Sequence, residues 1–177
     1  MNNREFDRCM RRIQKGDKSG LKEIYEAYLS YIYAVILGIV KNKENAEDLT
    51  AEFFIKLWDM ADQYKAGNGH KTWMTVIARN MSIDFLRKAG REQLTEEVPE
   101  TSDTVSGANP SMENEVVGRM NFRETVDKLP EMERQILTMK LAGQMTFKEI
   151  AEILGMPMGT VTWKYQNSLE KLRRVGA

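Results

Sequence analysis

The fold of the last third of the chain is decided by one stretch, Thr146-Phe147-Lys148-Glu149-Ile150-Ala151-Glu152-Ile153-Leu154-Gly155-Met156-Pro157-Met158-Gly159-Thr160-Val161. Thr146 and Glu149 have the spacing of a capping box, in which each side chain binds a free backbone amide of the first helical turn. Gly155 ends that short helix, and Pro157 suits the first turn of a second helix that runs to about Arg173. A short helix, a glycine-containing turn and a second helix together predict a helix-turn-helix.

The second helix of this motif carries candidate DNA contacts on its outer face. At about 100° per residue, Val161, Tyr165, Ser168 and Leu172 turn toward the core, which leaves the opposite face for a ligand. Amide side chains can bind adenine edges, and cationic ones can bind phosphates. The residues predicted to contact duplex DNA are Thr160, Thr162, Trp163, Lys164, Gln166, Asn167, Lys171 and Arg174. A three-helix packing unit without a DNA role is the alternative, which an outward Trp163 disfavours.

A helix predicted over residues 45–62 has two contrasting faces. Its core face holds Ala46, Leu49, Phe53, Leu57 and Met60. The opposite stripe holds Asp48, Glu52, Ile55 and Asp59. Two acidic residues four positions apart repel each other on an isolated helix. The stripe is therefore either a solvated acidic face or a docking surface for a basic partner, with Ile55 at its apolar centre.

A basic, glycine-containing loop over residues 64–71 precedes a helix predicted over residues 72–88. An outward tryptophan beside amide and arginine side chains can stack and hold an unpaired base. The candidate single-strand contacts are Lys65, Asn68, His70, Lys71, Trp73, Asn80 and Arg87. A partly buried Trp73 among ordinary surface residues is the alternative, and a lone histidine such as His70 is usually a surface loop residue.

The zero net charge of the 177-residue chain conceals three segments. Residues 1–91 carry a net charge of +4 and residues 119–177 carry +3, whereas residues 92–118 have seven acids and no Lys or Arg. The middle segment is rich in Glu, Ser, Thr, Pro and Gly, so it cannot bury enough apolar area to fold. We therefore predict an all-α protein: two small helical domains, residues 1–91 and 119–177, joined by a flexible acidic linker over 92–118. Charge attraction between linker and domains suggests a compact free form.

The remaining composition favours a cytoplasmic protein. The longest apolar run, residues 31–40, is half the length that a membrane helix needs. The N-terminus has no apolar signal segment, and one cysteine, Cys9, excludes an internal disulfide. The sequence offers no nucleophile–base pair, no phosphate-binding glycine loop and no second histidine for a metal site. We therefore predict a protein that is not an enzyme and uses no cofactor, metal or small-molecule substrate.

Taken together, both helical blocks resemble the extracytoplasmic-function (ECF) group of bacterial RNA polymerase sigma factors. The residues that resemble that family's region 2 are 46–58, 72–74, 77–80 and 84–87, and those that resemble its region 4 are 129–130, 150–157 and 159–161. The order and spacing of the two blocks make this resemblance specific.

The resemblance implies a sigma factor that directs polymerase to promoters and helps to melt them. Asp48, Glu52, Ile55 and Asp59 would dock on the coiled coil of the polymerase's largest subunit. The loop and helix of the first domain would bind the unpaired −10 strand, and the helix-turn-helix would bind the −35 duplex. An anti-sigma factor is a further implied partner. The alternative is a free-standing helix-turn-helix regulator that binds symmetric duplex DNA as a dimer.

Overall fold

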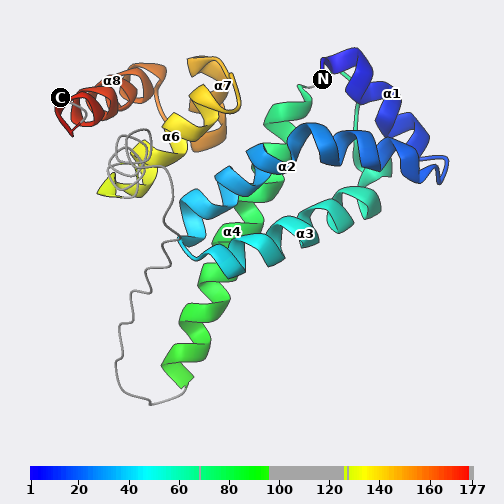
Figure 1. Cartoon of the computed structure of the whole chain (residues 1–177), viewed down its shortest axis with the longest axis horizontal. Coiled ribbons are helices and arrows are strands. Elements are labelled where there is room, and N and C mark those ends of the chain that lie inside the picture. Colours follow the sequence, from blue (N-terminus) through cyan, green and yellow to red (C-terminus); the bar gives the residue numbers. More distant parts are fainter. Residues whose placement is uncertain (68, 96–125, 127, 176–177) are drawn as a thin grey trace, which may run out of the picture.

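The computed structural model describes residues 1–67, 69–95, 126 and 128–175. Its helices are α1 (Asn3–Ile13), α2 (Lys18–Val40), α3 (Lys43–Asp59), η1 (Ala61–Gln63, a 3-10 helix), α4 (His70–Thr95), α6 (Glu131–Leu141), α7 (Phe147–Leu154) and α8 (Met158–Val175). No strand occurs among these residues, and the predicted all-α class is confirmed (Figure 1). The predicted linker lies outside the described residues, except that 92–95 form the end of α4.

The first bundle, α1–α4, encloses a core of apolar side chains from all four helices. The predicted core face of α3 is confirmed: Ala46, Leu49, Phe53 and Leu57 are buried, and Met60 packs against them. Lys41, with a φ of 61°, ends α2 in the left-handed conformation. The side chain of Asn42 then caps α3 by accepting from the amide of Asn45. A single left-handed residue and one cap thus set the turn between α2 and α3.

The first bundle differs from the sequence prediction at α1, at the end of α4 and at the end of α3, which stops at Asp59 and is followed by the separate helix η1. The sequence prediction did not include α1, although Asn2 and Glu5 form a complete capping box at its start. Phe6 and Met10 from α1 are fully buried, so this helix is part of the core. α4 continues seven residues beyond the predicted end at Lys88, because the residues that follow Gly90 are mostly good helix formers.

The second bundle, α6–α8, confirms the predicted helix-turn-helix. Thr146 and Glu149 form the expected capping box at the start of α7, and Gly155 ends α7 in the left-handed conformation with a φ of 62°. The core of this bundle contains Ile136, Met139, Met145, Ile150, Ala151 and Val161. Ala151 of α7 and Val161 of α8 are both buried in this core, where the two helices pack against each other.

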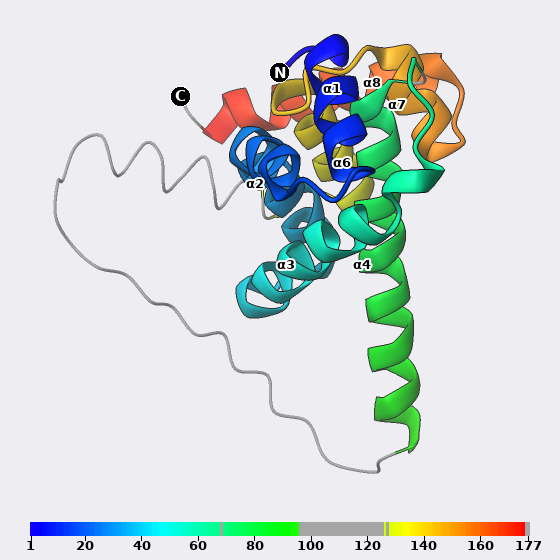
Figure 2. The same cartoon turned by 90° about the vertical axis from the view of Figure 1, so that its right-hand side faces the viewer.

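The two bundles are in contact with each other. Figure 2 shows α6 beside α2, and α7 near the first half of α4. Arg134 of α6 is buried, and its Nε donates to the carbonyl oxygen of Gly38 in α2 at 2.9 Å. Lys71 of α4 donates to the carbonyl oxygen of Gly143 at 3.0 Å, in the turn before α7. Side chains of each bundle thus bond to backbone carbonyl groups of the other bundle.

α2 is long and apolar enough to cross a membrane by length and composition alone. Half of its apolar window is buried inside the protein, and residues such as Ile24, Ile32 and Ile36 lie in the core of the first bundle. The apolar character of α2 is thus used in packing the bundle.

Candidate nucleic-acid and partner interfaces

The acidic stripe of α3 lies on the surface of the first bundle. Asp48, Glu52, Ile55 and Asp59 are all exposed, and the Ile55 side chain is 64% exposed. Within the described part of the chain none of the three carboxylates forms an ion pair. The stripe is therefore an acidic surface with an uncovered apolar residue at its centre.

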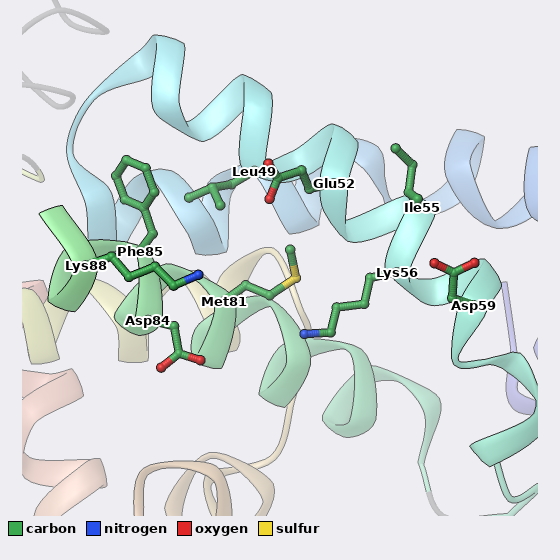
Figure 3. A pocket seen from close by; sticks show the side chains of 9 residues that line it. All are labelled: Leu49, Glu52, Ile55, Lys56, Asp59, Met81, Asp84, Phe85 and Lys88. Carbon is green, nitrogen blue, oxygen red and sulfur yellow. The ribbon is translucent and has the colours of Figure 1, made fainter.

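A groove of about 420 Å³ separates the stripe from α4 (Figure 3). Glu52, Ile55 and Asp59 contribute to its α3 wall, and Met81, Asp84 and Phe85 line its α4 wall. Lys56 and Lys88 extend into the space between the two helices in Figure 3. The groove thus joins the acidic stripe to the helix that carries the candidate single-strand contacts.

The candidate single-strand contacts occupy different environments. Lys65, Asn80 and Arg87 are exposed, and Arg87 pairs with Asp84 at 2.9 Å on its own helix. Trp73 is half-buried, and its ring packs against Tyr64 with centroids 5.0 Å apart. Asn68 lies outside the described residues. The structure therefore brings Trp73, Asn80 and Arg87 onto one helix, with Trp73 held by an aromatic neighbour.

His70 is a buried residue, so the expectation that it lies on the loop surface is wrong. Its side chain is stacked on Phe6, with ring centroids 4.5 Å apart, and hydrogen-bonds to Tyr28 and Asn3. The Asn3 oxygen can only accept, so Nδ1 donates to it, and the Tyr28 hydroxyl lies between Nε2 and the carbonyl oxygen of Met1, which is 3.1 Å from it. The ring joins α1, α2 and α4, and it is not available to an unpaired base in this structure.

We expect the burial of His70 to make the stability of the chain depend on pH. Burial lowers the pKa of His70 from 6.5 to about 4, so the unfolded chain takes up this proton first as the pH falls. The free energy of unfolding should therefore fall between pH 6.5 and 4, by about 3 kcal/mol from this group. Urea unfolding of the wild type and of His70→Gln, measured across that range, isolates the effect. Equal pH slopes for the two proteins would contradict it.

α8, the second helix of the helix-turn-helix, exposes only part of the predicted DNA face. Thr160, Trp163, Gln166 and Arg174 are exposed, and the Trp163 side chain is 60% exposed. Lys164 is half-buried and lies 6.0 Å from the Trp163 ring centroid. These residues remain available for bases and phosphates. Thr162 is half-buried, and its hydroxyl donates to the carbonyl oxygen of Met158 at 2.9 Å.

Asn167 and Lys171, two of the predicted DNA contacts, bond to α6 in this structure. Lys171 pairs with Glu133 of α6 at 2.8 Å, and the Asn167 amide donates to the same carboxylate at 3.3 Å. Ser168 donates to Glu133 as well, also at 3.3 Å. Glu133 is 5% exposed, so three residues of α8 bind one buried carboxylate. The sequence analysis did not predict this role of Glu133. A signal was present, because Asn167 and Lys171 lie beside Ser168, which was predicted to face the core.

Two further kinds of site, a metal site and a reactive thiol, were considered among the described residues. No group of three or more His, Cys, Asp or Glu side chains is placed there to hold a metal ion. Burial is the main cause of a raised pKa at Cys9, and its thiol hydrogen-bonds to Glu23. Such a thiol is protonated and poorly nucleophilic.

Two family models match the chain, one for each bundle. Sigma-70 region 2 matches residues 24–92, and Sigma-70, region 4 matches residues 119–172. The ECF RNA polymerase sigma factor SigW of Bacillus subtilis (strain 168) is 28% identical over 93% of each chain. The ECF RNA polymerase sigma factor SigK of Mycobacterium bovis (strain BCG / Pasteur 1173P2) is 20% identical over 96% of this chain and 92% of the relative.

Solved structures that share the fold include two sigma factors bound to partner proteins. The sigma factor RpoE of Bartonella quintana, in complex with the anti-sigma factor NepR, gives a TM-score of 0.68 at 23% identity and covers 87% of this chain and 94% of its own. CnrH, in complex with the cytosolic domain of CnrY, gives a TM-score of 0.63 at 15% identity, covering 94% of this chain and 93% of its own.

Proposed function

Because the chain belongs to the ECF group of sigma-70 RNA polymerase sigma factors, we propose that its two bundles serve the two promoter elements separately. The protein directs the polymerase core to promoters for transcription initiation. The main support for these separate roles is that region 2 matches residues of the first bundle and region 4 matches residues of the second. On this proposal the domains are residues 1–91 and 119–177, with residues 92–118 as their linker.

The acidic stripe of α3 is the proposed docking surface for the polymerase. Its carboxylates at Asp48, Glu52 and Asp59 are exposed and lack ion-pair partners within the described residues. A basic surface on the coiled coil of the largest subunit would supply those partners, and Ile55 would add apolar area at the centre. An exposed apolar residue surrounded by charges is the arrangement expected of an interface centre.

The −10 strand is assigned to the loop before α4 and to the outer side of α4. Trp73 offers an aromatic surface for an unpaired base, Asn80 offers an amide for a base edge, and Lys65 and Arg87 offer phosphate contacts. Lys71 joins them only when its bond to Gly143 is released. Asn68, outside the described residues, remains a candidate from the sequence.

The −35 duplex is assigned to the exposed face of α8. Gln166 can bind a base edge, Trp163 can contact a thymine methyl group or a sugar, and Lys164 and Arg174 can bind phosphates. Thr160 stands at the exposed start of the helix. Asn167 and Lys171 are assigned to holding α8 in place through Glu133.

Several broader assignments follow from the family. We infer a cytoplasmic protein that acts as a specificity subunit, is not an enzyme and uses no cofactor. An anti-sigma factor is a further proposed partner, because the similar RpoE is held in a complex with one. The alternative of a free-standing dimeric regulator is not favoured, because a large part of the first bundle matches region 2.

Run-off transcription with purified core polymerase and the full chain tests this function. On a DNA library with randomised −35 and −10 elements, we expect products only when the chain is added, from templates enriched in two elements. Trp163→Ala should weaken enrichment at −35 roughly tenfold while −10 enrichment persists, since one base contact contributes about 1–3 kcal/mol. Met158→Ala changes another exposed apolar residue of α8 and serves as the control. Products without enrichment of either element would refute the function.

A further inference from the structure

The segment that leads from η1 into α4 is held along one face of α1. Three side-chain hydrogen bonds connect the two: Gln14 to Ala61, Asp7 to Tyr64 and Asn3 to His70. Asn3, Asp7 and Gln14 are spaced by four and seven residues, so they lie on one face of the helix. Their partners follow in the opposite order along the chain. The segment therefore runs antiparallel to α1 and is bonded to it at both of its ends.

Tyr64 connects this bonded segment to the tryptophan proposed for an unpaired base. Its ring contacts both Phe6 of α1 and Trp73 of α4, with centroids 5.3 and 5.0 Å away. Its hydroxyl donates to Oδ1 of Asp7 at 2.6 Å. Burial raises the pKa of Tyr64, and the hydrogen bond to Asp7 raises it further, so the hydroxyl remains a donor. Two residues of α1 thus hold Tyr64, one at its ring and the other at its hydroxyl.

The position of Trp73 depends on this support. Trp73 is half-buried, so part of its ring is accessible and part is packed against the protein. A stacking surface binds a base more tightly when its position is fixed in advance, because immobilising a side chain on binding lowers the affinity. The match to region 2 begins at residue 24, so it assigns no role to α1. The contacts of Tyr64 indicate what that role is.

We propose that α1 positions the −10 contact surface: Phe6 and Asp7 fix Tyr64, and Tyr64 fixes the ring of Trp73 for the unpaired base. Asp7 is thus a positioning residue that acts through Tyr64. This role of α1 rests on the proposed −10 function of Trp73. A substitution that releases Tyr64 from α1 weakens recognition of the −10 element and leaves the −35 element unaffected, because the second bundle makes the −35 contacts.

Substitutions at Asp7 test this role in the full chain. Asp7→Ala removes the acceptor of the Tyr64 hydroxyl, whereas Asp7→Asn loses the same charge and keeps an oxygen that can accept. In transcription from the randomised library, Asp7→Ala should lower enrichment at −10 roughly fivefold, which is part of the loss expected for a whole base–aromatic stack. Asp7→Asn is the matched control and should stay close to the wild type. Tyr64→Phe, which keeps the ring, should lower −10 enrichment as Asp7→Ala does. Enrichment at −35 should not change in any of them.

A double-mutant cycle with Trp73→Ala shows whether Asp7 acts through that ring. Trp73→Ala alone should lower −10 enrichment about tenfold or more. Adding Asp7→Ala should then cause no further loss, because no ring is left to position. Additive losses would mean that Asp7 acts on −10 recognition independently of Trp73, and they would overturn the positioning role.

Fluorine NMR of the free chain, labelled with 5-fluorotryptophan, follows the same ring without DNA. The chain has three tryptophans, and Trp73→Phe identifies the signal of Trp73. Asp7→Ala should shift or broaden that signal, while the signal of Trp163 in the second bundle stays unchanged.

The two measurements together separate the positioning role from the proposed function. An unchanged Trp73 signal in Asp7→Ala would overturn the positioning role and leave the function intact. Full −10 enrichment by Asp7→Ala, while Trp73→Ala loses it, would do the same. If Trp73→Ala itself retained full −10 enrichment, the proposed −10 function of Trp73 would fail, and the positioning role would fail with it.

Discussion

Replacing Glu52 with lysine should weaken binding of the chain to core RNA polymerase by at least about 30-fold. The variant puts a cation in the middle of an acidic stripe that we assign to a basic partner, so an attractive contact becomes a repulsive one. Loss of a central interface residue commonly costs about 2 kcal/mol or more, which corresponds to this factor. Asp48→Lys should behave in the same way. Fluorescence anisotropy of labelled full chain, titrated with purified core, measures both affinities.

Misfolding would not explain such a loss. Asp48 and Glu52 are four residues apart on α3 and repel each other, whereas Asp48 and a lysine at position 52 would attract. Glu52 also lies four residues before Lys56, and both line the same groove, so the variant exchanges an attraction at Asp48 for a repulsion at Lys56. Its stability in urea should therefore stay within about 0.5 kcal/mol of the wild type. Glu47→Lys makes the same charge change at an exposed position on another side of α3 and should bind core almost normally. Equal affinities for Glu52→Lys and Glu47→Lys would remove the docking role of the stripe.

Replacing Glu133 with alanine should loosen the recognition helix and weaken −35 binding. The carboxylate accepts hydrogen bonds from Asn167, Ser168 and Lys171, and hydrogen bonds to a charged group typically contribute about 1.5–3 kcal/mol. Because Lys171 is partly exposed and can return to water, we expect a loss of about 2 kcal/mol in the stability of the second bundle. Hydrogen exchange of α8 amides in the full chain should speed up roughly 30-fold.

Two further variants show whether Glu133 acts through its charge. Glu133→Gln keeps the shape and one acceptor oxygen but loses the ion pair with Lys171, so its α8 exchange rates should lie between those of the wild type and Glu133→Ala. Glu152→Ala removes an exposed acid of α7 and serves as the control. If Glu133→Ala and Glu152→Ala exchange at the same rate, Glu133 does not hold α8.

Features that depend on neighbouring residues could be predicted from the sequence. The capping box of Thr146 and Glu149 and the helix end at Gly155 are confirmed, because their bonds close within one helical turn. The inward positions of α3 and α8 are confirmed as well, because burial follows helical periodicity: Phe53 and Val161 are fully buried. The box formed by Asn2 and Glu5 was equally visible, and neglecting it left α1 out of the predicted fold.

Features that depend on residues far apart in the sequence could not be predicted in this way. His70 follows a glycine in a basic loop, and only the packing of α1 and α2 against α4 brings Phe6 and Tyr28 around its ring. Lys171 looks like a phosphate contact from its position near a basic C-terminus, but it pairs with a residue 38 positions earlier. In both cases the sequence indicated a polar side chain that needs a binding partner, but it did not indicate which residue that partner is.

The sequence by itself determined that this protein has two helical units, which faces of their helices are buried, and the family to which they belong. Those properties follow from local hydrogen bonds, from the 3.6-residue period and from motifs read along the chain. Only the tertiary structure decided which polar side chains are free to meet DNA and that Arg134 reaches across to Gly38. A buried polar side chain must find a hydrogen-bond partner, because leaving it unpaired costs free energy. Many residues could chemically serve as that partner, and only the packing of distant segments decides which one does.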